Sequence, residues 1–332
     1  GTEVQWRVRY RRPDMVVNNG EQNVTFNRED QFKVATLNYQ GYVISDTITK
    51  REKLMNTGKE AIIDYYSQIV PLLMDAIGDQ FGQEIYVDDS AAGNTGRMGG
   101  IESFMGATQT ITVTSGAART ANVADVAGYP NDTYAGLSTV LGNYSGAWDT
   151  QSAISSTWPA GRGDYDFDFY SPIIVNYPSS GFSATATFAA NGVLATRYGL
   201  THARRNSSAN GGVDMILFDR DLYRQFCGLY DSKEQLTVMS GNNGGLWSVG
   251  FRDMINFEGC DVTSEFGIPS AVGYGFNLSQ MKLLSMQDSI FKAEGPYYDE
   301  STRTDRFVVD VLGQFQFMSP RNFIKFMSLA AA

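Results

Sequence analysis

The chain has 332 residues, of which 42% are hydrophobic and 19% are charged, so it can bury a sizeable core and is not a disordered protein. Aromatic residues make up 13%, and glycine is frequent, which favours many short strands and turns over a helical bundle. The formal net charge of −10 argues against a protein that coats nucleic acid directly, because phosphate binding depends on Lys and Arg. A container for nucleic acid needs no such charge. No apolar run approaches the length that spans a membrane, so no membrane partner is expected.

The first 48 residues predict an extended hairpin arm. Over Val4–Arg12, apolar and basic side chains alternate with the period of a half-buried strand. The partner strand is expected from Phe32 to about Ile48, and Pro13 and Gly20 mark turns between the two strands. Because a lone two-stranded ribbon is marginal in water, this arm is expected to rest on another surface.

The next segment predicts a long amphipathic helix at about 49–81. Thr49 with Glu52 has the spacing of a capping box, and Thr57 with Glu60 offers a second start, which is compatible with a break near Asn56–Gly58. Apolar residues then recur every three to four positions along one face. They are Ile62, Tyr66, Ile69, Leu73 and Ile77. Pro71 is expected to bend the helix, and Gly82 to end it.

Beyond the helix, the pattern becomes mixed. We predict a short strand at Glu84–Val87, a glycine-rich loop from Asp88 to Gly100, strand and loop over 107–129, a helix at 132–143, and a helix at about 185–198 that Gly199 ends. Val213–Phe218 reads as a buried strand, followed by a short helix that Asp219 begins. Arg306–Phe317 alternates well and places its apolar residues on one face. They are Phe307, Val309, Val311, Phe315 and Phe317.

Residues with catalytic chemistry are few. His202 is the only histidine, which excludes multi-histidine zinc sites, and a Ser–His–Asp triad would have to use it. It follows the end of the 185–198 helix, where a satisfied or solvated histidine is the simpler interpretation. Asp164, Asp166 and Asp168 share one face of a predicted strand and could form a cation site or a glycosidase pair. A strand with a wet acidic face and a buried aromatic face explains the same pattern.

The glycine-rich loop and the cysteines also favour structural roles. The stretch Gly93–Gly100 contains no Lys, so it does not match a phosphate-binding loop, and Asp88 and Asp89 do not have calcium-loop spacing. Cys227 and Cys260 are expected to be small apolar residues and not a redox pair. We therefore predict no enzyme activity, no cofactor and no metal site.

The charge of the N-terminal segment differs from that of the body. Residues 1–12 contain four arginines against Glu3, a formal +3, which leaves −13 for the remainder. A basic arm on an acidic body suits contact between copies of the chain. A basic strand face that is merely solvated is the alternative, and charge alone does not separate the two.

The order of these parts resembles the Hong Kong 97-type fold of tailed-bacteriophage major capsid proteins, which encapsulins share. The resemblance covers nearly the whole chain: a hairpin arm, a long helix, the stretch Glu84–Asp89, and a glycine-rich turn that ends in Gly100–Ile101. Later matches are Val213–Tyr223, the turn Phe266–Pro269 and the ending Ser319–Phe326. It implies an α+β fold with an extended arm, a spine helix, and peripheral and axial domains.

The resemblance also implies a domain plan and candidate sites. The plan has an arm at 1–48, a peripheral domain at 49–130, a mainly axial domain at 131–275, and returning strands at 276–332. The arm residues expected at contacts between subunits are Trp6, Arg7, Arg9, Arg11 and Arg12, and the structural loop residues after the spine helix are Gly93, Gly96, Gly100 and Ile101. Some family members crosslink an arm Lys to a neighbour, but residues 13–31 contain no Lys and Lys33 lies just beyond them, so crosslinking is not carried over.

The implied function is self-assembly, as hexamers and pentamers, of an icosahedral head shell around packaged double-stranded DNA. It implies a virion protein assembled in the bacterial cytoplasm, with portal, scaffold and decoration proteins as further partners and no sequence-specific contact with the DNA. An encapsulin-type shell that encloses enzymes is the alternative with the same fold. A secreted carbohydrate-active protein is the alternative from a different class, based on the aromatic and Asp content of 158–170.

Overall fold

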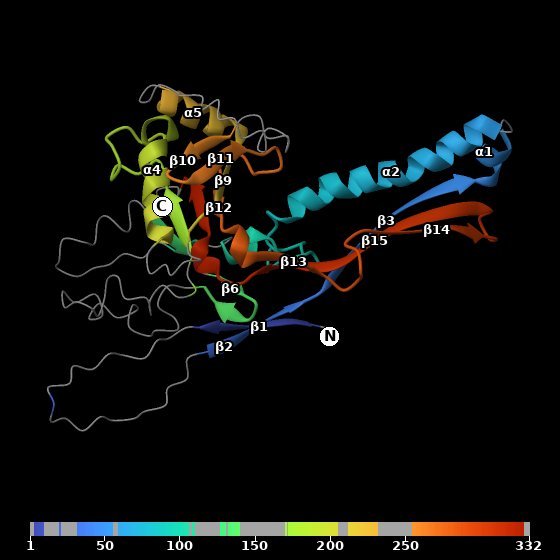
Figure 1. Cartoon of the computed structure of the whole chain (residues 1–332), viewed down its shortest axis with the longest axis horizontal. Coiled ribbons are helices and arrows are strands. Elements are labelled where there is room, and N and C mark those ends of the chain that lie inside the picture. The colour runs from blue at the N-terminus through green and yellow to red at the C-terminus, as the bar shows by residue number, and fades with distance from the viewer. Residues whose placement is uncertain are drawn as a thin grey trace. The chain divides into compact units, whose positions relative to one another are not determined.

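The computed structural model describes residues 3–9, 20, 32–55, 59–105, 108–109, 127–130, 132–139, 170, 172–204, 212–231 and 254–328. The chain forms two compact units (Figure 1). Unit 1 contains residues 1–4, 37–103 and 282–316, and unit 2 contains residues 5–36, 104–281 and 317–332. The domain plan expected from the sequence, with an arm, a peripheral domain, an axial domain and returning strands, stays a prediction.

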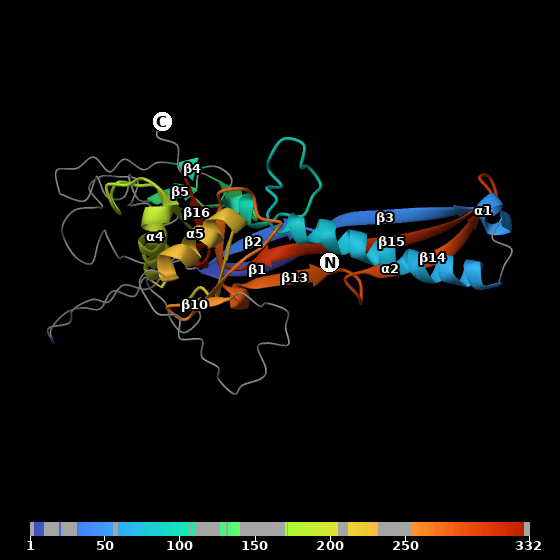
Figure 2. The ribbon, with the colours of Figure 1, turned by 90° about the horizontal axis from the view of Figure 1, so that it is seen from above.

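Unit 1 is a long helix on one face of a four-stranded sheet. Its strands are β3 (Gln40–Thr49), β13 (Met281–Ser285), β14 (Lys292–Asp299) and β15 (Thr304–Phe317), and its helices are α1 (Lys50–Met55) and α2 (Lys59–Glu84). β15 lies at the centre and pairs antiparallel with the whole length of β3, from Thr304 opposite Thr49 to Gly313 opposite Gln40. β14 pairs with β15 on the other side. Figure 2 shows α2 lying along this sheet.

Packing of α2 follows the predicted apolar stripe. Ile69, Leu73 and Ile77 are buried, and the ring of Phe81 lies 5.3 Å from that of Phe315 in β15. The helix continues through Pro71 and Gly82 to Glu84, so Gly82 does not end it. Among the described residues, no atom outside the helix's own backbone and the two chain neighbours lies within 4 Å of the position that a Cβ on Gly82 would take. The side chains of Ile62 and Tyr66, and residues 56–58, lie outside the described part.

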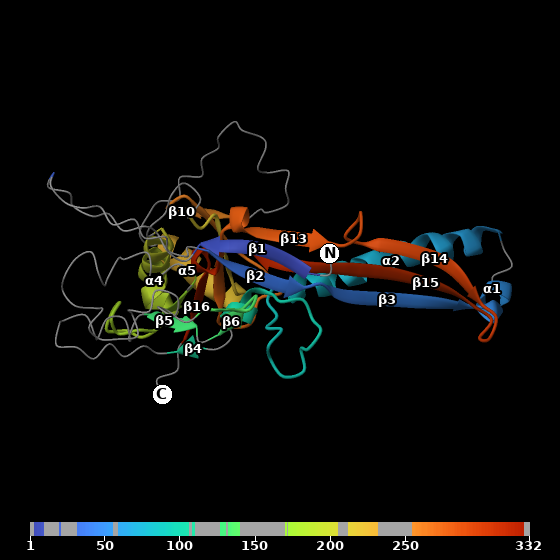
Figure 3. The same ribbon diagram turned by 90° about the horizontal axis from the view of Figure 1, so that it is seen from below.

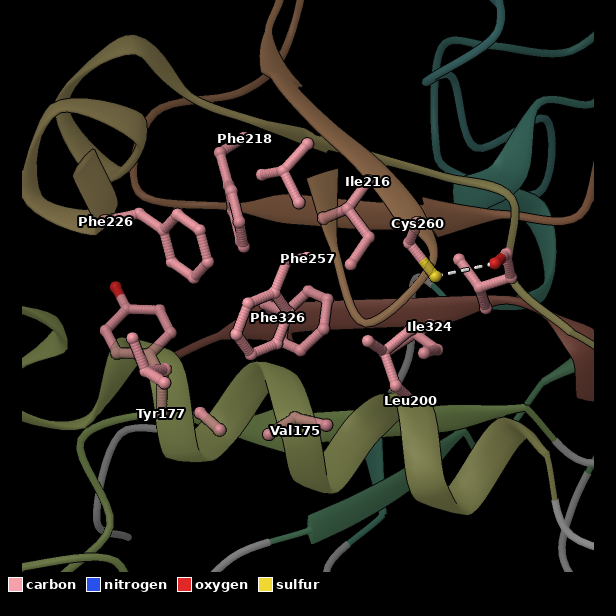
Figure 4. Close-up of a cluster of buried hydrophobic side chains, with 14 of the residues drawn as sticks. Val175, Tyr177, Leu200, Ile216, Phe218, Phe226, Phe257, Cys260, Ile324 and Phe326 are labelled. Carbon is pink, nitrogen blue, oxygen red and sulfur yellow. Dashed lines mark hydrogen bonds between the residues drawn. The ribbon is translucent and has the colours of Figure 1, made fainter. Parts of the chain in front are cut away.

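Unit 2 is a mixed sheet covered by two helices. The strand order is β10 (Ile255–Phe257), β11 (Cys260–Ser264), β9 (Met215–Phe218), β12 (Gly273–Phe276), β16 (Ile324–Met327), β8 (Ile173–Asn176), β5 (Ala127–Pro130) and β4 (Thr108–Gln109). α4 (Phe188–Ala203) and α5 (Arg220–Asp231) pack together against it. Figure 4 shows their core, in which Phe218, Phe226 and Phe326 pack together.

A second aromatic cluster fills unit 2 near the chain's last strands. The ring of Phe104 lies 5.1 Å from Tyr134, 5.2 Å from Phe317 and 5.8 Å from Phe323. The Tyr134 hydroxyl accepts a hydrogen bond from the backbone N–H of Phe317 at 3.1 Å. The chain also contains three short 3-10 helices: η1 (Ile101–Phe104), η4 (Leu278–Gln280) and η5 (Pro320–Asn322).

Several sequence-based predictions hold. Val213–Phe218 contains β9 and leads into α5, as expected, and β15 buries its predicted apolar face. β1 (Glu3–Arg9) pairs with β2 (Phe32–Asn38) as the base of the arm. Cys260 is buried, as expected of a small apolar residue, whereas Cys227 is half-buried.

Other predictions are wrong. β3 belongs to the sheet with β15 and does not extend the arm. Glu84–Val87 is not a strand, because the N–H groups of Tyr86 and Val87 donate to Gln83 and Glu84 in a turn. The helix predicted at 132–143 begins as a hairpin of β6 (Thr133–Tyr134) and β7 (Leu137–Ser138). Its turn residues Ala135 and Gly136 have φ of 53° and 76°, which a helix does not allow.

The helix predicted at 185–198 also has different ends. α4 runs from Phe188 to Ala203, so Gly199 lies inside it and so does His202. A Cβ on Gly199 would lie 3.0 Å from the Phe326 ring. Glycine at this position therefore allows close packing inside the helix and does not end it. In the part of the chain that the structure describes, no helix is long and apolar enough to cross a membrane.

Candidate assembly surfaces

The β1–β2 hairpin is anchored by Trp6. Its side chain is half-buried, its Nε1 donates to the carbonyl oxygen of Met318 at 3.1 Å, and its ring lies 6.2 Å from that of Tyr134. These partners belong to unit 2 of the same chain. The structure therefore places Trp6 at the attachment of the hairpin to its own chain, and the predicted contact with a neighbouring subunit stays a prediction.

The outer face of the hairpin combines apolar and basic side chains. Val8 and Ala35 are buried, whereas Arg7, Phe32 and Val34 are exposed, Phe32 to 51%. The predicted alternation is present, but solvent reaches Phe32 and Val34. Exposed apolar and cationic side chains on one hairpin are typical of interaction surfaces. The side chain of Arg9, and residues Arg11 and Arg12, lie outside the described part.

The loop after α2 depends on glycine for two different reasons. Gly93 and Gly96 have φ of 93° and 91°, in the left-handed region. Gly100 is needed for space, because a Cβ there would lie 2.4 Å from the carbonyl oxygen of Ile85. The N–H of Ile101 donates to that same oxygen at 2.7 Å, and the Ile101 side chain is fully buried. The structural role predicted for these residues fits this geometry.

A polar cluster, which the sequence did not reveal, fixes this loop to β3 and α2. The Tyr42 hydroxyl donates to Glu84 Oε2 at 2.7 Å and accepts from the backbone N–H of Met98 at 2.7 Å. Arg97 pairs with both oxygens of Glu84, its Nε lying 3.1 Å from Oε2. A carboxylate in the last turn of a helix is unfavourable, because the C-terminal end of the helix carries partial negative charge. The position of Glu84 in the sequence could therefore have indicated that a cation lies nearby.

The pKa values of Tyr42 and Arg97 both depend on their contacts with Glu84. Burial, followed by the hydrogen bond to Glu84, raises the pKa of Tyr42 to about 12. The hydrogen bond to Glu84 also raises the pKa of Arg97. The cluster keeps Tyr42 neutral and Arg97 cationic at neutral pH, and its hydrogen bonds attach the loop to β3 and α2.

The acidic residues of the loop are engaged in local structure. Asp88 Oδ1 accepts from the N–H and hydroxyl of Ser90 at 2.9 and 2.6 Å. Burial raises the pKa of Asp89, whose N–H donates to the Ser103 hydroxyl at 3.2 Å. Among the described residues, no group of three or more His, Cys, Asp or Glu could hold a metal ion. Asp164, Asp166 and Asp168 lie outside the described part, as does the side chain of His202.

Unit 1 is the acidic part of the chain. It contains 17 Asp and Glu against nine Lys and Arg, a formal −8 of the total −10. The hairpin, with its exposed Arg7, belongs mostly to unit 2. The predicted arm residues therefore lie in unit 2, and the predicted loop residues lie in unit 1.

Comparison with known proteins places the fold. No family model and no curated protein matches the chain. Solved structures do match: the cyanophage A-1(L) capsid asymmetric unit has a TM-score of 0.56 at 15% identity, over 99% of this chain and 89% of that one. The mature capsid of bacteriophage PhiM1 has a TM-score of 0.51 at 10% identity, over 100% and 83%.

A third match is a structure of Mycobacterium phage Adephagia, with a TM-score of 0.50 at 11% identity, over 100% of this chain and 87% of that one. All three extend over nearly the whole of this chain, through both units. The α+β, Hong Kong 97-type architecture predicted from the order of sequence elements is therefore confirmed, and the chain has the fold of tailed-bacteriophage capsid proteins.

Proposed function

We propose that the chain is the subunit of a closed icosahedral shell, assembled as hexamers and pentamers around packaged double-stranded DNA. The single observation that supports this most strongly is the match of the whole chain, 99% of its length, to a subunit of a phage capsid. Folds host many functions, so the proposal needs the surfaces as well as the architecture.

The described surfaces suit a building block. A shell subunit makes heterologous contacts on several edges, and this chain carries an exposed apolar and basic hairpin face and an acidic unit 1. Contact of one copy's hairpin with another copy's unit 1 would pair opposite charges, which favours correct orientation and rapid association. Such contacts need no catalytic group and no cofactor, so we propose no enzyme activity.

The setting follows from the same proposal. The protein would be a component of the virion, assembled in the cytoplasm of a bacterial host, with portal, scaffold and decoration proteins as further partners. The DNA would be enclosed without sequence-specific contact, because the wall of an acidic shell does not bind phosphates.

Sedimentation of the purified protein tests the proposal. A shell subunit is expected to give a fast-sedimenting particle that resists dilution. Protein that stays monomeric under every assembly condition would contradict it. The contents separate the two shell functions: nuclease-resistant DNA in particles from infected or induced cells supports a phage head, whereas enclosed protein would support an encapsulin.

A further inference from the structure

The sheet of unit 1 has two edges, one formed by β3 and the other by β13 and β14, and the two edges differ. β14 contains Pro296, which has no backbone N–H, and a register shift between Glu294 and Tyr297. Proline and bulges are devices by which native sheets prevent pairing with another strand. β3 contains no proline and, among the described strands, pairs with β15 alone. Figure 3 shows β3, β15 and β14 side by side, with β3 at one edge and α2 behind them.

Backbone bonds show which residues of β3 face outward. The last opposed residues of the two strands are Thr49 and Thr304. At the next position, the N–H of Lys50 donates to the carbonyl oxygen of Arg303 at 3.0 Å. Since backbone direction alternates along an antiparallel strand, the even-numbered residues of β3 face β15. The odd-numbered residues point their N–H and C=O groups away from the sheet.

Part of this outward edge is closed by the chain itself. The N–H of Thr47 is bound by Asp46 Oδ1 at 2.7 Å, and that of Thr49 by Glu52 Oε2 at 2.9 Å. These carboxylates occupy the end of the edge next to α1. The remaining outward positions are Gly41, Val43 and Ser45, and we call Gly41–Ser45 the open edge.

Side chains around the open edge suit the arrival of another strand. The outward residues of β3 also place their side chains on the face opposite α2, and they are all uncharged: Gly41, Val43, Ser45, Thr47 and Thr49. Val43 is 69% exposed, and Leu312, opposite Gly41, is 38% exposed. A Cβ on Gly41 would lie 2.7 Å from Leu312 Cδ2, so glycine allows Leu312 to lie across the strand beside the open edge.

We infer that the open edge pairs with an extended segment of a second copy of this chain, the basic stretch Arg9–Arg12. Charge selects this occupant: the edge belongs to a unit with a formal −8, and residues 1–12 carry a formal +3. Asp310 stands opposite Val43 in β15, and the carboxylate of Asp46 lies at the end of the edge. The four residues of this basic stretch are similar in length to the open edge. The inference rests on the proposed function, because it requires that copies of the chain associate.

Proline substitution tests the edge itself. Val43→Pro removes an outward N–H that bonds to none of the described residues, so the monomer is expected to fold while shell formation is lost. Ala293→Pro is the matched control, because Ala293 stands opposite Val309, a residue that bonds to β3, and so faces outward on β14. This control is expected to form shells at the wild-type yield.

The proline variant and the wild-type protein distinguish failure of the inference from failure of the proposed function. Val43→Pro protein that forms shells at the wild-type yield would overturn the inference and leave the proposed function intact. Wild-type protein that forms no shell would instead contradict the proposed function.

A crosslinking experiment tests the occupant and does not depend on the proline variant folding. Val43→Cys and Arg11→Cys proteins, each in a Cys227→Ser background, are mixed, assembled and oxidised. A disulfide-linked dimer with one chain of each kind is expected in shells, and none is expected when Ala293→Cys replaces Val43→Cys. Shells without the Val43→Cys/Arg11→Cys dimer would overturn the assignment of Arg9–Arg12.

Discussion

Gly100 stands against the backbone of Ile85, so closely that a Cβ on residue 100 would lie 2.4 Å from the Ile85 carbonyl oxygen and 2.6 Å from that of Glu84. Backbone atoms cannot move aside as flexible side chains do. This contact closes the loop that follows α2 and brings Ile101 to its buried position.

Gly100→Ala is therefore expected to destabilise the subunit. Overpacking of this kind costs about 1–3 kcal/mol, and more where backbone must shift. Gly82→Ala is the matched control, because Gly82 is exposed within α2 and has open space around it. That control is expected to gain about 0.5–1 kcal/mol from helix propensity. Denaturant unfolding of unassembled protein measures both, and equal effects of the two substitutions would contradict the packing argument.

Arg97→Ala should destabilise the subunit by about 1–3 kcal/mol, because it leaves the buried Glu84 carboxylate without its cation. In a Glu84→Gln background, the same substitution should cost less, since the charge it compensates is absent. A double-mutant cycle from urea unfolding curves measures this coupling. Additive effects would show that the Arg97–Glu84 pair contributes nothing to stability.

Tyr42 predicts a dependence of stability on alkaline pH. Its pKa is raised to about 12 in the folded chain, against about 10 for an unfolded tyrosine. Its contribution is therefore fully present below pH of about 10 and is lost as the pH rises toward 12, because the unfolded state releases the proton first. Tyr42→Phe should have a flatter stability profile between these values. A wild-type profile that is equally flat would contradict the environment assigned to Tyr42.

The two thiols should react at different rates. Cys260 is fully buried, its thiol donates to the carbonyl oxygen of Val213 at 2.8 Å, and burial raises its pKa. Because the thiolate is the reactive form, Cys227 should react first with a thiol reagent, and Cys260 only on unfolding. Cys227→Ser protein should show almost no reaction until denaturant is added. Rapid labelling of that variant in its native state would contradict the buried position of Cys260.

Reversing charge on the hairpin should impair assembly without unfolding the subunit. Arg7 is exposed, so Arg7→Glu with Arg9→Glu is expected to remove the proposed attraction to acidic unit 1 while the anchor at Trp6 remains. The Arg7→Lys, Arg9→Lys protein is the control that keeps the charge. Light scattering during assembly measures the yield, and normal particles from the Glu variant would show that the hairpin charge has no role.

The periodicity of apolar residues predicted those helices and strands whose buried face is visible within a single segment of the sequence. The stripe of Ile69, Leu73 and Ile77 and the alternation of β15 were readable because their periods are properties of single elements. The partner of β3 was not readable, because β15 lies far along the chain and the nearer strand β1 offered a plausible hairpin. The same reason hid the open edge of β3, whose direction depends on pairing with β15.

Where local signals conflicted with tertiary packing, the packing decided. Asp132 and Thr133 resembled a helix start, but burial of Tyr134 among aromatic rings and the left-handed Ala135–Gly136 pair produced a hairpin instead. Gly199 resembled a helix end, but its missing side chain serves contact with Phe326. The Tyr42–Glu84–Arg97 cluster joins three separate segments, so no spacing in the sequence revealed it.

Electron microscopy of the purified protein tests the central claim most directly. A shell subunit is expected to form closed icosahedral particles of uniform diameter, with the fold of units 1 and 2 repeated in every copy of the wall. A monodisperse population of single subunits that forms no closed particle under any assembly condition would contradict the assignment of this chain as a capsid-forming protein.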